Sequence, residues 1–376
     1  MPIPFIDLKF QYQKHKLNID DAIHRVLDHG QYIMGPEVKE LEKQLADFIG
    51  VKHVLACSSG TDALVIPLMA KGIKPGDVVF TTPFTFFASA ESITLAGGTP
   101  VFVDIDPKTY NICPIDLEKK IKIEQQKNTN RLRGVMPVDL FGLAADYKQI
   151  NDIAKKYDLF VIEDSAQAFG ANYHGKKACG LGDVAGTSFY PAKPLGCYGD
   201  GGAVFTNDDK LYDAMMSIRV HGQGISGDKY DNVRIGLNAR MDTIQAAILL
   251  EKLKHYDDEI MLRNQVANTY SQNLHDKVLT PFIPQGQNSV WAQYSIQVED
   301  REKLKADLAE KGIPTATFYP TPIHLSGAYS ELTYKEGDFP VSERISKHIV
   351  SLPMHPFLKE QQIMSICNAV NKSVSK

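Results

Sequence analysis

The chain has 376 residues, of which 43% are hydrophobic and 23% charged, and its formal net charge is −4. These values are ordinary for a globular enzyme, and the small negative charge excludes the strong basic bias of proteins that bind nucleic acids or anionic membranes. The length exceeds the size at which a single hydrophobic core usually stops growing, so we expect two domains. We assign residues 1–250 to a large domain, whose segment 1–15 can pack on a smaller domain at residues 251–376.

The spacing of the cysteines and histidines and the N-terminal residues bear on the cellular compartment and on metal binding. The five cysteines lie far apart and include no CxxC pair, which argues against a zinc site or a disulfide framework and suits a reducing compartment. No apolar run approaches the length of a membrane span, and the N-terminus lacks a basic region followed by an apolar core. The eleven histidines form no HxxxH or HExxH pattern. We therefore predict a cytoplasmic protein without a metal site.

The N-terminal half alternates between helix-like and strand-like apolar patterns. Apolar residues recur at helical spacing in segments 16–29 and 38–48. Strands are then predicted at 53–57, 78–82, 100–104 and 134–138, with helices at 63–71, up to 93, at 114–123 and at 146–157. Repeated alternation of this kind predicts a parallel sheet covered by helices on both faces. Ligands of such sheets bind beyond the carboxyl ends of the strands.

Small and aromatic residues follow the first two predicted strands. Gly60 and Thr61 let backbone amides approach an anion, and the free amides of the helix that starts there favour a phosphate. An ordinary helix N-cap uses the same residue types, so the turn alone leaves both interpretations open. After the second strand, one of Phe84, Phe86 and Phe87 can stack on a planar ligand, while the others belong to the core.

The central stretch supplies a carboxylate and an unusual lysine. A short apolar run at 159–162 ends in Asp164, which predicts a buried parallel strand that delivers a carboxylate to the sheet edge. A second strand at 184–189 leads to Lys193, which lies between two prolines. A poorly solvated lysine loses proton affinity and becomes a nucleophile able to form a Schiff base, although many lysines in turns are simply exposed. Asp164 favours the first interpretation, because pyridoxal phosphate needs a carboxylate to keep its pyridine nitrogen protonated.

The C-terminal half reads as helices and a strand that lead into the smaller domain. Helices are predicted at 210–220, 241–257, 260–274, 301–311 and 360–370, and strands at 203–206 and 291–298. Asn238 and Arg240 lie in a polar loop before a long helix, and Tyr319 lies in a proline-rich segment. These residue types alone assign them no role.

Several motifs, in one order, carry a resemblance to a known family. They are SGTDAL at 59–64, PFTF at 83–86, VDID at 103–106, EDSAQ at 163–167, SFYPAKPLG at 188–196 and GDGG at 199–202. The chain resembles the DegT/DnrJ/EryC1/StrS family of pyridoxal-phosphate-dependent sugar aminotransferases. The resemblance implies the α/β type I aminotransferase fold, with a mostly parallel seven-stranded sheet covered by helices and a smaller α+β C-terminal domain.

The resemblance also implies roles for particular residues. Lys193 would hold pyridoxal phosphate and act as the catalytic acid-base, Asp164 would bind the pyridine nitrogen, and Gln167 would lie below the ring. Phe86 is the family's usual aromatic above the ring. The phosphate would be bound by Gly60, Thr61, Ser188 and an Asn238 that reaches in from the neighbouring subunit of a homodimer, and substrate by Arg240 and Tyr319.

The reaction implied is transfer of an amino group from L-glutamate, through pyridoxamine phosphate, to a nucleotide-linked keto sugar. Segments 193–202 and 351–356 are most similar to members that aminate UDP-2-acetamido-2-deoxy-3-oxo-D-glucuronate for lipopolysaccharide O-antigen. Those members commonly have His where this chain has Phe318, so the corresponding sugar contact is not carried over. The alternatives are a dTDP-linked 3- or 4-keto-6-deoxysugar as acceptor, a pyridoxamine-phosphate-dependent sugar dehydratase, in which the family's lysine is replaced, and a non-catalytic regulatory protein.

Overall fold

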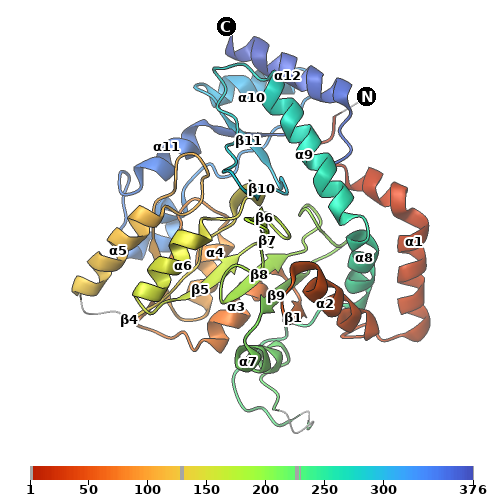
Figure 1. The fold of residues 1–376 in the computed structure, drawn as a ribbon, viewed down its shortest axis with the longest axis vertical. Coiled ribbons are helices and arrows are strands. Elements are labelled where there is room, and N and C mark those ends of the chain that lie inside the picture. Colours follow the sequence, from red (N-terminus) through yellow and green to blue (C-terminus); the bar gives the residue numbers. More distant parts are fainter. Residues whose placement is uncertain (1–2, 128–130, 225–227, 229, 376) are drawn as a thin grey trace.

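A seven-stranded sheet forms the centre of the molecule (Figure 1), whose computed structural model describes residues 3–127, 131–224, 228 and 230–375. The strand order is β1-β9-β8-β5-β4-β2-β3. The strands are β1 (His53–Cys57), β2 (Asp77–Thr81), β3 (Thr99–Phe102), β4 (Arg131–Val135), β5 (Phe160–Asp164), β8 (Val184–Ser188) and β9 (Gly202–Thr206). Strand β9 pairs antiparallel with both neighbours, and the other pairs are parallel. The predicted mostly parallel sheet is confirmed.

Helices cover both faces of this sheet (Figure 1). They are α2 (Pro36–Ile49), α3 (Gly60–Ala70), α4 (Ala88–Leu95), α5 (Pro114–Lys127), α6 (Tyr147–Lys156), α7 (Asp209–Arg219) and α8 (Thr243–Leu253). Helix α1 (Leu8–His29) packs on α8. Successive strand residues point to opposite faces. In β2, Val78 and Phe80 therefore join the core under α5 and α6, whereas Val79 joins the core under α3 and α4. This two-sided burial explains why the strands read as continuous apolar runs.

Several element boundaries differ from the predictions, among them the start of α1 and both ends of β4. Helix α1 begins at Leu8 rather than at residue 16, because the Asp7 side chain accepts a hydrogen bond from the Phe10 N–H at 2.9 Å and caps the first turn. The predicted strand at 134–138 lies at Arg131–Val135, where it pairs with β2 and β5. Beyond Val135 the pairing continues only as an isolated bridge between Val138 and Asp164.

The C-terminal part builds its own hydrophobic core from helices and a small antiparallel sheet. Its helices and strands are α9 (Tyr256–Asn273), β11 (Tyr294–Gln297), α10 (Arg301–Ala309), α11 (Pro340–His348), β12 (Ile349–Leu352) and α12 (Glu360–Val374). Short 3-10 helices lie at Leu140–Gly142, Ile323–Leu325 and Gly327–Leu332. The two-residue strands β6 (Asn172–Tyr173), β7 (Lys176–Lys177) and β10 (Gln287–Asn288) form a third sheet. Ile3 packs on the C-terminal core, and the Phe5 carbonyl accepts from the Met354 N–H at 3.1 Å. The domain boundary near residue 250 stays a prediction.

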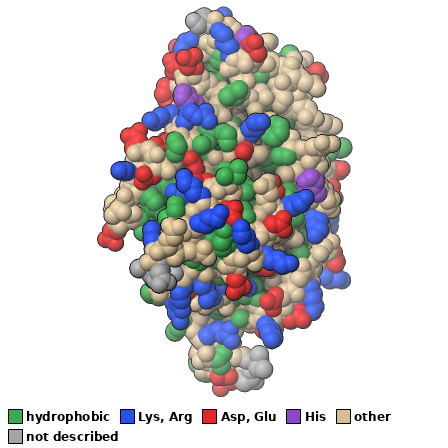
Figure 2. Space-filling model, turned by 60° about the vertical axis from the view of Figure 1, so that its left-hand side comes forward, with side chains coloured by type: hydrophobic (Ala, Val, Ile, Leu, Met, Phe, Trp, Pro, Cys, Tyr) green, Lys and Arg blue, Asp and Glu red, His purple; other side chains and the backbone are tan. Residues whose placement is uncertain are grey.

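The outer surface is mixed in character. Lys and Arg side chains are interspersed with Asp and Glu on the face drawn in Figure 2. Among the residues that the structure describes, no helix is both long and apolar enough to cross a membrane.

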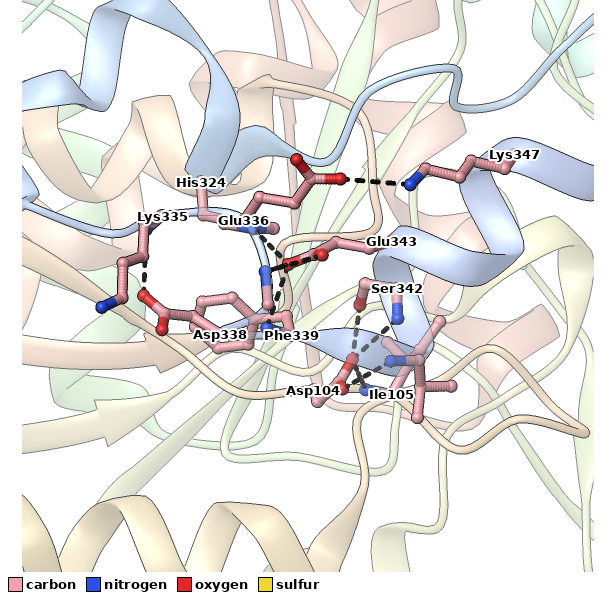
Figure 3. Close-up of polar contacts among 12 residues, drawn as sticks. Asp104, Ile105, His324, Lys335, Glu336, Asp338, Phe339, Ser342, Glu343 and Lys347 are labelled. Carbon is pink, nitrogen blue, oxygen red and sulfur yellow. Dashed lines mark hydrogen bonds and ion pairs between the residues drawn. The ribbon is translucent and has the colours of Figure 1, made fainter.

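A buried polar cluster ties helix α11 to the end of strand β3 (Figure 3). The buried Asp104 carboxylate accepts from the backbone N–H groups of Val341 and Ser342, both at 3.0 Å, and from the Ser342 hydroxyl at 2.6 Å. Glu343 accepts from two backbone N–H groups and contacts His324 Nε2 at 3.1 Å. Asp104 thus caps the first turn of α11 from a segment far away in the sequence.

Replacing Asp104 by alanine is expected to destabilise the fold by about 2 kcal/mol, because the change leaves two helix N–H groups buried without an acceptor. The matched control is Glu336→Ala, which removes the exposed ion pair with Lys347 at 3.1 Å and should cost less than about 1 kcal/mol. Chemical unfolding of the two variants measures the difference. Equal losses would show that Asp104 does not act as the cap.

Candidate active site

The carboxyl ends of β1, β2, β5 and β8 open on one cavity of about 550 Å³. All but two of the site residues predicted from the sequence line it. They are Gly60, Thr61, Phe86, Asp164, Gln167, Ser188, Lys193 and Tyr319. The volume is within the range of pockets for cofactors and small ligands. The sheet edge is where the strand–helix alternation placed a ligand.

Lys193 lies in a tight loop after β8. Its backbone N–H donates to the Tyr190 carbonyl at 2.8 Å, and the Cys197 N–H donates to the Phe189 carbonyl at 2.8 Å and so closes the loop. Poor solvation of the ammonium group lowers the pKa of Lys193 to about 8, although the charge of Asp164 opposes this shift. Near physiological pH, Lys193 is therefore neutral far more often than an ordinary lysine, and the neutral amine is the nucleophilic form.

Asp164 ends strand β5 and is only 3% exposed. Its carboxylate accepts from the Ser89 hydroxyl at 2.6 Å and from the Ala166 N–H at 3.2 Å. Burial raises the pKa of Asp164, while these two hydrogen bonds and the charge of Lys193 lower it. A buried carboxyl group that faces a cavity and is short of positive charge fits a protonated ring nitrogen.

The start of helix α3 and two neighbouring strand ends form a cradle of backbone groups. A Cβ atom on Gly60 would meet the Ser188 Cβ at 2.5 Å, and one on Gly202 would meet the Ser59 carbonyl oxygen at 2.3 Å. Only glycine allows this close approach. The Ser59 hydroxyl caps the helix by accepting from the Asp62 N–H at 3.1 Å. The first helix amides of α3 and the Ser188 hydroxyl are thus available for a phosphate.

Gln167 and Phe86 both line the cavity. The Gln167 amide is held by two hydrogen bonds, since its Oε1 accepts from the Phe141 N–H at 2.7 Å and its Nε2 donates to the Tyr319 hydroxyl at 2.9 Å. Phe86 is 59% exposed, whereas Phe84 is fully buried. Of the aromatic residues at this helix start, Phe86 is thus the one placed to stack on a ligand.

Asn238 and Arg240 do not line this cavity. The Arg240 Nε donates to the Asn238 Oδ1 at 2.9 Å, and both side chains lie at the surface of the chain.

Several cavity residues were not predicted from the sequence. They are Phe5 and Ile6 near the N-terminus, Ser89 in the first turn of α4, Tyr190, Asp200 and Gln293. Ser89, which holds Asp164, is one of several small residues at that helix start. No local pattern distinguishes it, because its partner is far away in the sequence.

A sheet-edge cavity of this construction, with a buried carboxylate opposite a lysine of lowered pKa, defines the class of pyridoxal-phosphate-dependent transferases. The profile of the DegT/DnrJ/EryC1/StrS aminotransferase family matches residues 13–371, and the chain belongs to that family. The resemblance found in the sequence is confirmed, and with it the type I aminotransferase fold, the aminotransferase activity and the cofactor.

Individual relatives refine the comparison. The chain is 49% identical over 369 residues to UDP-2-acetamido-2-deoxy-3-oxo-D-glucuronate aminotransferase from Pseudomonas aeruginosa, a match that covers 98% of this chain and 99% of the relative. It is 40% identical to dTDP-3-amino-3,6-dideoxy-alpha-D-galactopyranose transaminase from Aneurinibacillus thermoaerophilus, over 98% and 99% of the two chains. The crystal structure of a DegT DnrJ EryC1 StrS aminotransferase from Brucella abortus matches with a TM-score of 0.97 and 48% identity over 100% of both chains.

Proposed function

We propose that this enzyme transfers an amino group from L-glutamate to UDP-2-acetamido-2-deoxy-3-oxo-D-glucuronate during O-antigen assembly. The observation that carries the proposal is the 49% identity to the Pseudomonas aeruginosa enzyme over almost the whole of both chains. The presence of Lys193 in the cavity argues against the dehydratase alternative, whose members lack this lysine. It also argues against a non-catalytic role, because the nucleophile and its opposing carboxylate are both in place.

The residues of the cavity divide the work between binding and proton transfer. Pyridoxal phosphate supplies an electron sink and carries the amino group between the two substrates. Lys193 would hold the cofactor through Nζ and, once released, would move the proton between the amino-acid α-carbon and the C4′ atom of the cofactor. Asp164 would bind the ring nitrogen, and Gln167 and Phe86 would lie on the two sides of the ring. Gly60, Thr61 and Ser188, which line the cavity, would hold the phosphate.

The sugar end of the cavity is lined by a segment of the C-terminal part. Tyr319 lines the cavity near Phe86, with ring centroids 6.4 Å apart, which supports a contact between Tyr319 and the sugar. Phe318 also lines the cavity and packs near Phe5, with centroids 6.4 Å apart. Because Phe318 has no hydrogen-bonding group, it offers the sugar an apolar surface where a histidine would offer a donor or acceptor.

We also propose a homodimer whose subunits share their active sites. In support, Asn238 and Arg240 follow a segment that exposes large apolar residues, with Val233 57% and Ile235 84% exposed. Such a patch suits a protein interface. There Asn238 would bind the neighbour's cofactor phosphate and Arg240 its substrate. Light scattering that gives a monomer under assay conditions would contradict this arrangement.

A cytoplasmic location is part of the same proposal. In support, all five cysteines are free thiols in this structure, which suits a reducing compartment. Recovery of the protein with the periplasmic fraction of its cells would count against it.

A single-turnover experiment tests the proposed substrate. The enzyme is first converted to its pyridoxamine phosphate form with glutamate, freed of glutamate, and then mixed with either the UDP-linked 3-oxo sugar acid or a dTDP-linked 3-keto-6-deoxysugar. We expect one amino group per active site to reach the UDP sugar, at a rate at least about 100-fold above that for the dTDP sugar, since lost polar contacts cost this much or more. A faster reaction with the dTDP sugar would reassign the substrate.

A further inference from the structure

Three polar side chains lie completely buried behind Asp164. They are Asp139, Glu163 and Ser165, and each is 0% exposed. Glu163 and Ser165 flank Asp164 in the sequence, and because successive residues of an extended chain alternate, they point away from the cavity that Asp164 faces. Asp139 comes alongside through its backbone, whose N–H donates to the Asp164 carbonyl at 2.9 Å.

Glu163 is surrounded by hydrogen-bond donors. Its Oε2 accepts from the backbone N–H groups of Leu181 at 2.9 Å and Gly182 at 3.3 Å. Its Oε1 accepts from the Cys179 N–H at 2.5 Å and from the Ser165 hydroxyl at 2.8 Å. Burial raises the pKa of Glu163, whereas the hydrogen bonds from the backbone of Leu181 and Cys179 lower it and so favour the ionised form.

Asp139 has fewer backbone donors than Glu163, and the Tyr147 hydroxyl also interacts with its carboxyl group. Its Oδ1 accepts from the Ala145 N–H at 2.9 Å, and its Oδ2 makes a short contact with the Ser165 hydroxyl, which also reaches Glu163. The carboxyl groups of Asp139 and Glu163 also lie near enough for each to affect the pKa of the other.

The Ser165 hydroxyl contacts the carboxyl groups of both Asp139 and Glu163, and two ionised carboxylates could not both be satisfied by it. Ionised carboxylates only accept hydrogen bonds, and the Ser165 hydroxyl has a single hydrogen to give. One carboxyl group must therefore carry a proton. Burial, and then the charge of Glu163, raise the pKa of Asp139 well above its usual range. Asp139, with a single backbone donor, is the group that this arrangement leaves neutral.

We propose that Asp139 is a protonated carboxylic acid whose hydrogen bond to Ser165 and Glu163 positions the loop at 164–167. This inference rests on the proposed roles of Asp164 and Gln167 toward the cofactor. Asp139 reaches both, because Phe141, two residues along its own chain, donates to Gln167 at 2.7 Å. Asp139 is thus a positioning residue that fixes the carboxylate at the ring nitrogen and the amide below the ring from behind.

Three substitutions separate a neutral Asp139 from an ionised one. Asp139→Asn keeps an acceptor for Ala145 and gives an N–H donor in place of the acid proton, so cofactor affinity should stay within about threefold of native. Asp139→Ala removes the bridge and should weaken pyridoxal phosphate binding at least about tenfold. Glu163→Gln turns an NH2 group toward backbone N–H donors, so it should weaken cofactor binding at least as much as Asp139→Ala does.

Cofactor affinity is measured by absorbance titration, and the rate of the glutamate half-reaction is measured with each variant saturated with cofactor. The proposal is supported if Asp139→Asn keeps near-native cofactor affinity and a near-native rate of the half-reaction while Asp139→Ala loses both. If Asp139→Asn is as impaired as Asp139→Ala, the group acts as an anion and the proposal fails. If Asp139→Ala binds the cofactor and reacts as the native chain does, the positioning role fails.

Infrared difference spectra of the native holoenzyme test the proton directly. The carbonyl band of a protonated carboxyl group should be present and should disappear in Asp139→Asn. A band that persists in Asp139→Asn but disappears in Glu163→Gln would move the proton to Glu163 and overturn the assignment. A native chain that binds no pyridoxal phosphate would instead refute the proposed roles of the cavity residues. The infrared spectra would still test the protonation of Asp139, because that test does not depend on the cofactor.

Discussion

Replacement of Lys193 by alanine is expected to lower the rate of the glutamate half-reaction by at least about 10⁴-fold. Positioned acid-base catalysis is worth about 10²–10⁴-fold, and this variant also loses the amine that holds the cofactor. In this structure, poor solvation lowers the pKa of Lys193 to about 8, so it is prepared for both tasks. The fold should survive, because the loop is closed by the backbone groups of Tyr190, Phe189 and Cys197 rather than by the lysine side chain.

The measurement is the visible absorption of the lysine-bound cofactor, followed before and after addition of glutamate. Native protein should show a band that glutamate bleaches, whereas Lys193→Ala should show none. Lys176→Ala, which changes an exposed lysine outside the cavity, is the matched control and should behave as native. A bleachable band in Lys193→Ala would show that another amine holds the cofactor. A native band that glutamate leaves untouched would point to a different amino donor.

Much of the large sheet could be predicted because its signals are local. A parallel strand covered on both faces must be apolar along its whole length, so β1, β2, β5 and β8 stand out as short runs that end in polar or small residues. Those run ends are also where Asp164 and Gly60 reach the cavity. The sequence therefore locates the sheet edge and the chemistry on it by the same pattern.

The features that escaped prediction depend on partners far away in the chain. Helix α11 and strand β12 have no counterpart among the predicted elements, since α11 is capped by Asp104 rather than by a neighbouring residue. Ser89 gains its role only when the fold brings it to Asp164. The proton that we propose on Asp139 is inferred from the contacts of the Ser165 hydroxyl with two carboxyl groups, which apolar periodicity does not encode.

The resemblance to a family added what local patterns could not supply. It selected Phe86 from a run of aromatic residues, and the structure places that ring in the cavity while Phe84 is buried. It also assigned roles to Asn238 and Arg240, which a single chain does not bring to its own cavity. Their roles stay predictions, because they depend on a second subunit.

Asp164→Asn is expected to lower kcat/KM for glutamate by about 10²–10⁴-fold while leaving the fold intact. Removing one partner of a buried charge pair costs about 3–5 kcal/mol, and each 1.36 kcal/mol corresponds to a tenfold change in rate. The loss arises because an uncharged amide does not keep the ring nitrogen protonated, so the ring is a weaker electron sink. Asparagine still offers an oxygen to Ser89, whose hydroxyl now donates to Asp164 at 2.6 Å, which protects the local structure.

Asp183→Asn is the matched control for this variant. Asp183 also accepts a backbone hydrogen bond on strand β5, from the Val161 N–H at 2.8 Å, but it is exposed and lies outside the cavity. Steady-state kinetics with glutamate should show a near-native rate for Asp183→Asn and the large loss for Asp164→Asn. When Asp164→Asn is reconstituted with the N-methyl analogue of the cofactor, whose ring nitrogen carries a fixed positive charge, part of the lost rate should return. If the analogue restores nothing, Asp164 contributes through packing rather than through its charge, and its assignment to the ring nitrogen is wrong.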